Sequence, residues 1–329
     1  MNDLHKIAKQ MVAPGKGILA ADESNGSADK RLAFIGVEGS EEMRRRYREL
    51  FIGTKGIGDY LSGIILYDET MTQKDGRGES FLEILKRENV LIGIKVDEGK
   101  DPDPHSSFET LTKGLASLPE RLPKYYEMGA RFAKWRAVIK IGEKLPTQEN
   151  IEHEMMHLAK YAGLCQANGI VPMVEPEVLL DGDHSQQRAA DVVFVALKVL
   201  FEQLAVAEVD LKGLILKTSM VLPGKDHVDG QVSPEKVAKF TVDVLKEVVP
   251  KDVAGVVFLS GGQGADEATA NLRAINDLQP LPWPTTFSYA RAIQGPALEM
   301  WRGNENFVQK AREQFAQRVQ SNVKVLKRS

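Results

Sequence analysis

The feature that most constrains the fold of this 329-residue chain is an alternation of short apolar runs with longer amphipathic segments. The segments between the runs repeat apolar positions every three or four residues, which predicts helices. Several runs are apolar nearly throughout, as strands buried on both faces are. We therefore expect parallel strands with crossover helices, the strands covering residues 17–22, 62–68, 91–97, 132–141, 170–178, 213–220, 255–262 and 285–290.

Eight strand-then-helix units are the number that closes a barrel, so we predict an α/β fold of the (β/α)8 TIM-barrel class. The open, doubly wound sheet is the alternative arrangement of such units. Because no linker rich in Gly, Ser or Pro interrupts the alternation, residues 1–329 are predicted to form a single domain. The amphipathic segment 304–327 lies beyond the eighth strand and is predicted to pack on the barrel as an additional C-terminal helix.

Composition and charge narrow the classes of partner. A net charge of -3 and a pI of about 6.1 provide no basic field that would attract nucleic acid or an anionic membrane. No run approaches the roughly 18 apolar residues that span a bilayer. The single cysteine, Cys165, excludes an internal disulfide and favours an intracellular compartment. We expect a cytoplasmic enzyme with no nucleic-acid and no membrane partner; a removed organelle transit peptide is the alternative.

Polar side chains gather at the ends of the predicted strands, where the active sites of such barrels lie. Residues two apart on a strand share a face, so Lys134 with Arg136, and Glu175 with Glu177, can point inward together. Any one such charge is more simply explained by an ion pair with a neighbouring helix. Charges at many strand ends are costly unless they form a network. The residues are Asp22, Lys95, Lys134, Arg136, Glu175, Glu177, Lys217, Ser260, Ser288 and Arg291.

Lys217 is the candidate nucleophile in this group. It follows the apolar run 213–216, so its stem should be buried while its amine reaches the mouth of the barrel. Desolvation and a second nearby cation, for which Lys134 is the candidate, both favour the neutral amine that attacks a ketone.

Two segments could bind phosphate. Ser260-Gly261-Gly262 can offer unobstructed backbone N–H groups after the seventh strand, and Arg291 opens the helix after the eighth strand, where barrels commonly bind phosphate. The other segment is the predicted loop of residues 23–31, which carries hydroxyls and two cations. A helix N-cap with a solvated first turn explains that segment equally well.

A zinc-peptidase pattern offers a competing hypothesis. His153, Glu154 and His157 satisfy H-E-x-x-H, and Glu177 could serve as a third ligand. The pattern falls on the crossover helix before the fifth strand, however, and its N-terminal half is expected to face away from the catalytic mouth. Glu177 lies beyond the strand 170–174, on the far side of the layer. The zinc hypothesis is therefore disfavoured.

Seven segments of the sequence resemble those of class I fructose-bisphosphate aldolases. The matching stretches are GKGILAADESNGS, GIKVDEG, FAKWRAVIKIGE, NGIVPMVEPEVLLDGDH, LILKTSM, VVFLSGGQ and FSYARA, in family order from Gly15 to Ala292. The resemblance implies a metal-independent lyase of glycolysis and gluconeogenesis, without a cofactor, which cleaves fructose 1,6-bisphosphate through a lysine Schiff base. It also implies phosphorylated sugars as substrates and a homotetramer.

The resemblance also implies roles for residues of this chain. Lys217 would form the Schiff base, Glu175 would transfer protons, and Asp22 would contact the C4 hydroxyl. Lys134, Arg136 and Glu177 would complete the polar network. The C1 phosphate would bind at Ser260, Gly261, Gly262, Ser288, Ala290 and Arg291, and the C6 phosphate near Ser24, Ser27, Arg31 and Lys95.

The chain departs from the family pattern in three places. Thr218-Ser219 stands where Pro-Asn is frequent, and Ala290 stands where many members have glycine. The sequence ends at Ser329 without the long tail and terminal tyrosine of animal members, so we expect enamine protonation to proceed without that residue. Fructose 1-phosphate and sedoheptulose 1,7-bisphosphate are alternative substrates. A partner-docking scaffold is a further alternative, but it predicts loss of active-site residues that are all present here.

Overall fold

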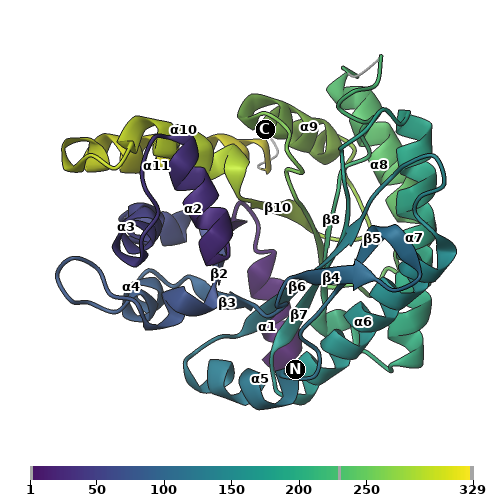
Figure 1. Ribbon diagram of the computed structural model, residues 1–329, viewed down its shortest axis with the longest axis horizontal. Coiled ribbons are helices and arrows are strands. Elements are labelled where there is room, and N and C mark those ends of the chain that lie inside the picture. The colour runs from purple at the N-terminus through teal and green to yellow at the C-terminus, as the bar shows by residue number, and fades with distance from the viewer. Residues whose placement is uncertain (1–2, 229–230, 327–329) are drawn as a thin grey trace.

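The computed structural model describes residues 3–228 and 231–326. Its centre is a closed barrel of parallel strands (Figure 1), which confirms the predicted TIM-barrel class and excludes the open sheet. Around the barrel the strands follow chain order: β1 (Gly17–Ala21), β2 (Leu61–Leu66), β3 (Leu91–Lys95), β6 (Phe132–Ile139), β7 (Val171–Val178), β8 (Ile215–Thr218), β9 (Gly255–Phe258) and β10 (Thr285–Tyr289).

Helices surround this barrel, as the amphipathic segments predicted. They are α2 (Asn25–Phe34), α3 (Glu41–Ile52), α4 (Phe81–Arg87), α5 (Leu118–Glu127), α6 (Gln148–Ala167), α7 (Gln186–Val206), α8 (Pro234–Val248), α9 (Ala265–Asp277), α10 (Arg291–Trp301) and α11 (Val308–Leu326). Short 3-10 turns lie at η1 (Ile57–Asp59), η2 (Asp68–Thr72), η3 (Leu211–Gly213) and η4 (Glu305–Phe307).

Side-chain caps fix where several helices begin. The side chains of Thr147, Ser185 and Ser233 each accept a hydrogen bond from a backbone N–H in the first turn of α6, α7 and α8. Such caps satisfy donors that have no partner inside the helix. They also set the residue at which each loop from the barrel mouth ends.

The C-terminal helix is confirmed. α11 begins at Val308 and packs along α10, with further contacts to α9 and α3 on the outside of the barrel. Figure 1 shows α10 and α11 together in yellow, next to the purple α2. Among the described residues, no helix combines the length and apolar character needed to cross a membrane.

Two elements were left open or unpredicted by the sequence. Helix α2 begins within the segment 23–31, for which a loop and the first turn of a helix were equally expected, so the helix alternative is the one observed. Residues 100–112, for which no element was predicted, form the antiparallel hairpin of β4 (Lys100–Asp103) and β5 (Ser106–Thr112). Both segments are polar, and β4 contains Pro102, so neither shows an apolar period.

The end of the barrel at which the strands begin is filled with apolar side chains. Helix α1 (Asp3–Met11) contributes Leu4, Ala8 and Met11 to a buried cluster. Its partners point inward from the strands and include Ile18, Phe132, Met173, Ile215 and Val257. This plug leaves only the opposite end, where the strands finish, open for polar chemistry.

Candidate active site

The charged side chains of the site face inward because they continue inward-facing apolar rows. On β8, Ile215 belongs to the cluster inside the barrel, whereas Leu216 belongs to the core between the barrel and its helices. Side chains alternate along a strand, so Lys217 points inward again, one step nearer the mouth. Only 3% of its surface is exposed.

The same alternation places the other charges. On β7 the inward row runs from Met173 to Glu175 and Glu177, which are all buried. On β6 it runs from Phe132 to Lys134 and Arg136. Residues Arg136 and Glu175 are direct neighbours in the β6–β7 register. The predicted inward orientation of these pairs is therefore observed.

One carboxylate lies between two ammonium groups at the centre of the site. Lys217 Nζ is 2.9 Å from Glu175 Oε1, and Lys134 Nζ is 3.1 Å from Glu175 Oε2. Lys134 Nζ is also 2.6 Å from Asp22 Oδ2. The four side chains therefore form a continuous charged row, buried among strands β1, β6, β7 and β8.

Burial and pairing act in opposite directions on these groups. Burial raises the pKa of Asp22, but Lys134 and Lys217 outweigh it and lower that pKa to about 2. Burial also raises the pKa of Glu175, which Lys134, Lys217 and Arg136 together lower below the usual value. For Lys134, burial lowers the pKa, while Asp22 and Glu175 raise it above the ordinary lysine value. In the free protein both carboxylates are therefore ionised at neutral pH.

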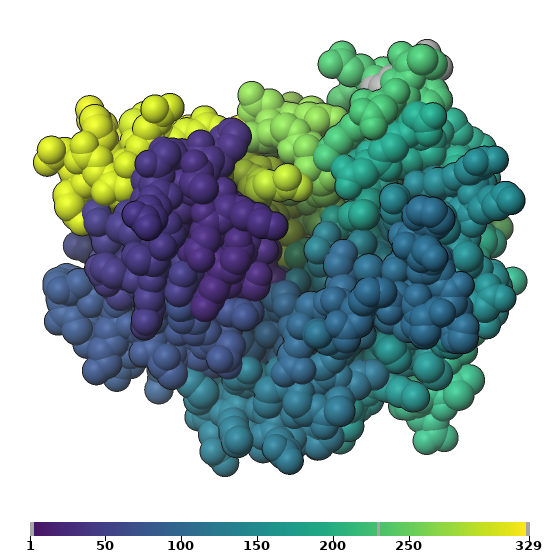
Figure 2. Space-filling model, viewed as in Figure 1, coloured from purple at the N-terminus to yellow at the C-terminus, as the bar shows by residue number. Residues whose placement is uncertain are grey.

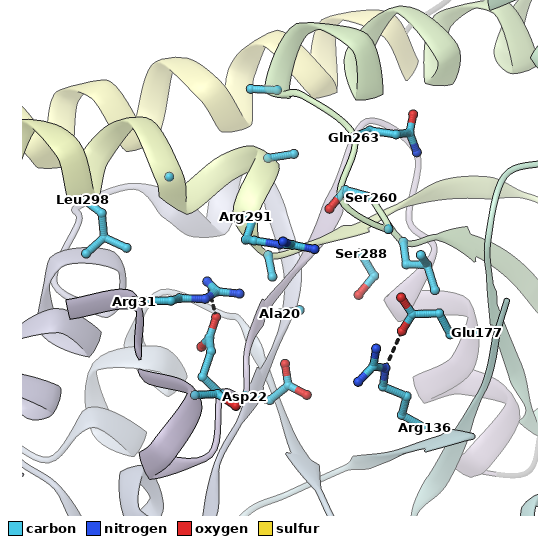
Figure 3. Close-up of a pocket in the computed structure, with 18 of the residues that line it drawn as sticks. Ala20, Asp22, Arg31, Arg136, Glu177, Ser260, Gln263, Ser288, Arg291 and Leu298 are labelled. Atoms are coloured by element: carbon cyan, nitrogen blue, oxygen red, sulfur yellow. Dashed lines mark hydrogen bonds and ion pairs between the residues drawn. The ribbon is translucent and has the colours of Figure 1, made fainter. Parts of the chain in front are cut away.

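Two further ion pairs border this row. Arg136 Nε donates to Glu177 Oε2, as the dashed line in Figure 3 shows. Lys95 Nζ lies 2.5 Å from Asp97 Oδ1 and donates to the backbone oxygen of the same residue. Asp97, two residues further along the chain, thus holds Lys95 at the wall of the site.

A cavity of about 790 Å³ opens above these groups. Figure 2 shows the mouth as a recess between the purple α2 segment and the blue hairpin. All the predicted site residues except Gly262 line the cavity: Asp22, Ser24, Ser27, Arg31, Lys95, Lys134, Arg136, Glu175, Glu177, Lys217, Ser260, Gly261, Ser288, Ala290 and Arg291.

The turn after β9 forms one end of the cavity. Gly261 and Gly262 have φ angles of +56° and +96°, values that side chains disfavour. A Cβ on Gly262 would lie 3.1 Å from Lys225 Nζ and 3.3 Å from Arg291 Nη2. A side chain at residue 262 would therefore crowd these two cations, so glycine suits this turn. Sequence reasoning did not identify Lys225, because it lies in an irregular segment far from any strand end.

Ser288 and Arg291 lie beside this turn (Figure 3). Ser288 Oγ is buried and has no hydrogen-bond partner among the described residues. Arg291 enters none of the ion pairs found in residues 3–228 and 231–326. A buried hydroxyl and an unpaired guanidinium in one cavity suit an anionic ligand. Ala290 has φ -109° at the start of α10, so the residue that replaces the family's frequent glycine does not need the positive φ that glycine allows.

Helix α2 borders the other end of the cavity. Ser24 precedes the helix, but its side chain makes no capping bond and donates instead to Ser27 Oγ, 3.1 Å away. Arg31 Nη1 lies 2.5 Å from Glu23 Oε1. Figure 3 shows Arg31 and Arg291 projecting into the same space from α2 and α10. The two predicted phosphate-binding segments thus open into one cavity.

Several lining residues were missed by sequence reasoning. Glu23, Phe34, Gln263 and Leu298 border the cavity, and Gln294 lies behind Arg31. Phe34 and Leu298 belong to the cavity wall formed by α2 and α10, which no strand-end pattern indicates. Only Glu23 could have been expected from the sequence, because it directly follows Asp22 at the end of the first strand.

The H-E-x-x-H residues lie outside this site. Glu154 is fully buried on α6, and its Oε1 accepts hydrogen bonds from Thr112 N and Thr112 Oγ1 at 2.8 and 2.9 Å. Within the described parts of the chain, no group of three or more His, Cys, Asp or Glu side chains is arranged to hold a metal. Glu154 anchors the β4–β5 hairpin to α6.

Comparisons with known proteins agree with this geometry. The family described as "Fructose-bisphosphate aldolase class-I" matches residues 3–327. A fructose-bisphosphate aldolase of Dictyostelium discoideum is 47% identical over 98% of this chain and 90% of its own length. A probable fructose-bisphosphate aldolase class 1 of Xylella fastidiosa is 48% identical over 92% of this chain and 90% of its own.

A solved structure is similar over nearly the whole fold. It is a fructose-bisphosphate aldolase from Plasmodium falciparum in complex with TRAP and a small-molecule inhibitor, with a TM-score of 0.97 and 44% identity. The alignment covers 98% of this chain and 94% of the other. The chain therefore belongs to the class I fructose-bisphosphate aldolases, lyases that act on phosphorylated sugars through a lysine Schiff base.

Proposed function

We propose that this chain cleaves fructose 1,6-bisphosphate with Lys217 as the nucleophile and Glu175 as the proton-transfer group. The contact of 2.9 Å between Lys217 Nζ and Glu175 Oε1 is the observation that carries this assignment. It joins an amine and a carboxylate in a cavity whose two ends carry Arg31 and Arg291. A ketose with a phosphate at each end matches this distribution of charge.

Formation of the Schiff base begins with proton transfer from the Lys217 ammonium to Glu175. The neutral amine attacks C2 of the ketone, and a proton passes from nitrogen to oxygen to give a carbinolamine. Glu175 then protonates the C2 hydroxyl, which leaves as water. The product is an iminium that retains the single positive charge that Lys217 had before the reaction.

Cleavage of the carbon–carbon bond uses the same carboxylate in its ionised form. Glu175 takes the proton of the C4 hydroxyl, which Asp22 orients, and the C3–C4 bond breaks. The bonding electron pair moves into the iminium and forms an enamine, while glyceraldehyde 3-phosphate departs. Protonation at C3 and hydrolysis of the resulting iminium release dihydroxyacetone phosphate. The cationic imine serves as the electron sink, a role that a metal ion performs in other aldolases.

Lys134 supports both stages of this reaction. Its ammonium touches Asp22 and Glu175 at once, and both carboxylates hold its pKa above the ordinary value. It therefore remains a cation while Glu175 gains and loses protons. Arg136 and Glu177 form the adjacent wall and complete the network.

The phosphates are assigned to the two ends of the cavity. The C1 phosphate binds the turn of Ser260, Gly261 and Gly262 with Ser288, Ala290 and Arg291. The C6 phosphate binds near Ser24, Ser27, Arg31 and Lys95. Among the described residues, the Ser288 hydroxyl has no hydrogen-bond partner and Arg291 enters no ion pair, which supports the first assignment. The hydroxyls of Ser24 and Ser27, which line the cavity and bond to each other instead of capping α2, support the second.

A substrate comparison tests this function. The purified chain is supplied with fructose 1,6-bisphosphate, fructose 1-phosphate or sedoheptulose 1,7-bisphosphate, each with and without a chelator, and triose phosphate is measured. We expect the highest kcat/KM for fructose 1,6-bisphosphate and no effect of the chelator. Loss of activity with chelator, or a clear preference for another sugar, would contradict the proposal.

The chain is further proposed to act in the cytoplasm as a homotetramer. An Arabidopsis thaliana relative, 49% identical over 94% of this chain and 79% of its own length, is named a cytosolic fructose-bisphosphate aldolase, which supports the compartment. Family membership supports the assembly. Light scattering during size-exclusion chromatography tests it, and a mass equal to that of one chain would contradict it.

A further inference from the structure

The guanidinium of Arg31 is held from behind by two side chains that come from other helices. Arg31 Nη1 donates to Gln294 Oε1, and it lies 3.2 Å from Tyr47 Oη, to which it also donates. Tyr47 Oη in turn donates to Gln294 Oε1 at 3.0 Å. Tyr47 belongs to α3 and Gln294 to α10, so three helices meet at this one nitrogen.

The two supporting side chains are themselves fixed. Gln294 is completely buried, and its Nε2 donates to the backbone oxygen of Ala20 on β1 at 2.9 Å. Tyr47 is 1% exposed, and its ring packs edge-on against Phe51. Burial raises the pKa of Tyr47 far above its ordinary value, so its hydroxyl keeps its proton. A buried, fully bonded pair of this kind presents its oxygens in one arrangement only.

The contacts leave one edge of the guanidinium for a ligand. Within the described residues, both hydrogen bonds of Arg31 are donated by Nη1, and the 2.5 Å contact with Glu23 Oε1 is made by Nη1 too. Nε and Nη2 remain, and Arg31 lines the cavity into which it projects in Figure 3. An arginine supported at one nitrogen can offer the other two to phosphate oxygens.

We propose that Tyr47 and Gln294 are positioning residues that aim Arg31 at the phosphate remote from C2, and so set the preference for bisphosphate over monophosphate sugars. This inference rests on the proposed function, in which Arg31 binds the C6 phosphate. An unsupported arginine would have to be ordered by the substrate itself. The cost of ordering one long side chain corresponds to a loss of about three- to tenfold in affinity.

The test compares fructose 1,6-bisphosphate with fructose 1-phosphate, which lacks the phosphate that Arg31 would bind. Tyr47→Phe and Gln294→Met each remove one supporting contact and keep most of the volume. The expected result is that the ratio of kcat/KM for the two substrates falls about three- to tenfold, through a higher KM for the bisphosphate. Arg31→Gln defines the full loss of preference.

Two controls separate positioning from general damage. Tyr161→Phe removes another buried phenolic hydroxyl, which donates to Met173 on β7, and should leave the ratio unchanged. Adding Tyr47→Phe to Arg31→Gln should lower the ratio no further, because the group that Tyr47 supports is already absent.

The outcomes are distinct. An unchanged ratio in Tyr47→Phe and Gln294→Met, with a reduced ratio in Arg31→Gln, would overturn the positioning role and leave the proposed function intact. An equal loss for both substrates would show a structural role only and would overturn it too. A wild-type protein that cleaves neither sugar would reject the proposed function itself.

Discussion

Lys217 and Glu175 are in direct contact, with 2.9 Å between the Lys217 Nζ and Glu175 Oε1 atoms. The proposed nucleophile and the group that exchanges its proton are thus adjacent before any substrate arrives. The contact lies within a row that continues through Lys134 to Asp22, so a change at one member alters the charge of the next.

Glu175→Gln should nearly abolish turnover while the protein still folds and binds sugar phosphates. The amide keeps the shape of the side chain but cannot take the proton of Lys217 or return it to the leaving hydroxyl. General acid–base groups contribute about 100- to 10,000-fold, so kcat should fall within that range, with a much smaller change in KM. Stopped-flow or coupled assays measure both constants. Normal kcat would remove Glu175 from the mechanism.

Lys134→Met should reduce activity and stability together. It leaves Asp22 and Glu175 buried without their shared cation. Breaking a buried ion pair on one side costs about 3 to 5 kcal/mol of the free energy of unfolding. Urea denaturation at neutral pH measures this change. Lys140→Met, at an exposed position just beyond β6, is the matched control and should stay close to wild type.

Arg291→Ala should weaken phosphate binding much more than it slows chemistry. A hydrogen bond to a charged group contributes about 1.5 to 3 kcal/mol, which corresponds to about a 10- to 100-fold increase in KM. The competitive inhibition constant of dihydroxyacetone phosphate should rise by a similar factor. An unchanged inhibition constant would place the C1 phosphate elsewhere.

Glu154→Gln should remove a pH dependence of stability. Burial raises the pKa of Glu154 to about 7 from its ordinary value of 4.5. Folding therefore favours the neutral form of Glu154. This effect stabilises the folded protein fully below a pH of 4.5 and is lost as the pH rises through about 7. The shift corresponds to about 3 kcal/mol.

The measurement is the free energy of unfolding of the wild type and of Glu154→Gln at several pH values from about 4.5 to 8. The wild type should lose stability relative to the variant as pH rises, because Gln keeps the acceptor for Thr112 and carries no charge. Glu152→Gln, exposed on the same helix, should follow the wild type. Parallel curves for wild type and Glu154→Gln would contradict the prediction.

The barrel and most of its cavity were predictable because both depend on local alternation. Apolar runs predicted the strands and the buried stem of Lys217, and the step of two residues placed Lys134 with Arg136, and Glu175 with Glu177, inside. The hairpin β4–β5 was not predictable, since its polar strands are held by contacts with α6 such as Thr112 with Glu154. Helix α2 was expected only as an alternative to a loop, because just two of its side chains, Ala28 and Leu32, are buried and they give little apolar period.

The support behind Arg31 was also beyond sequence reasoning. Tyr47 and Gln294 are separated from it by 16 and 263 residues and look like ordinary helix positions. Only the folded arrangement brings their oxygens to one nitrogen. Residues that touch a ligand can be found from strand ends, whereas residues that hold those residues require coordinates.

Borohydride reduction in the presence of dihydroxyacetone phosphate, with and without chelator and followed by peptide mass analysis, tests most directly whether Lys217 is the nucleophile. A reduced imine with the triose phosphate forms only on the lysine that acts as nucleophile. We predict one stable adduct, on Lys217, that chelator does not affect and that Lys217→Met lacks. An adduct on another lysine, or none, would contradict this prediction.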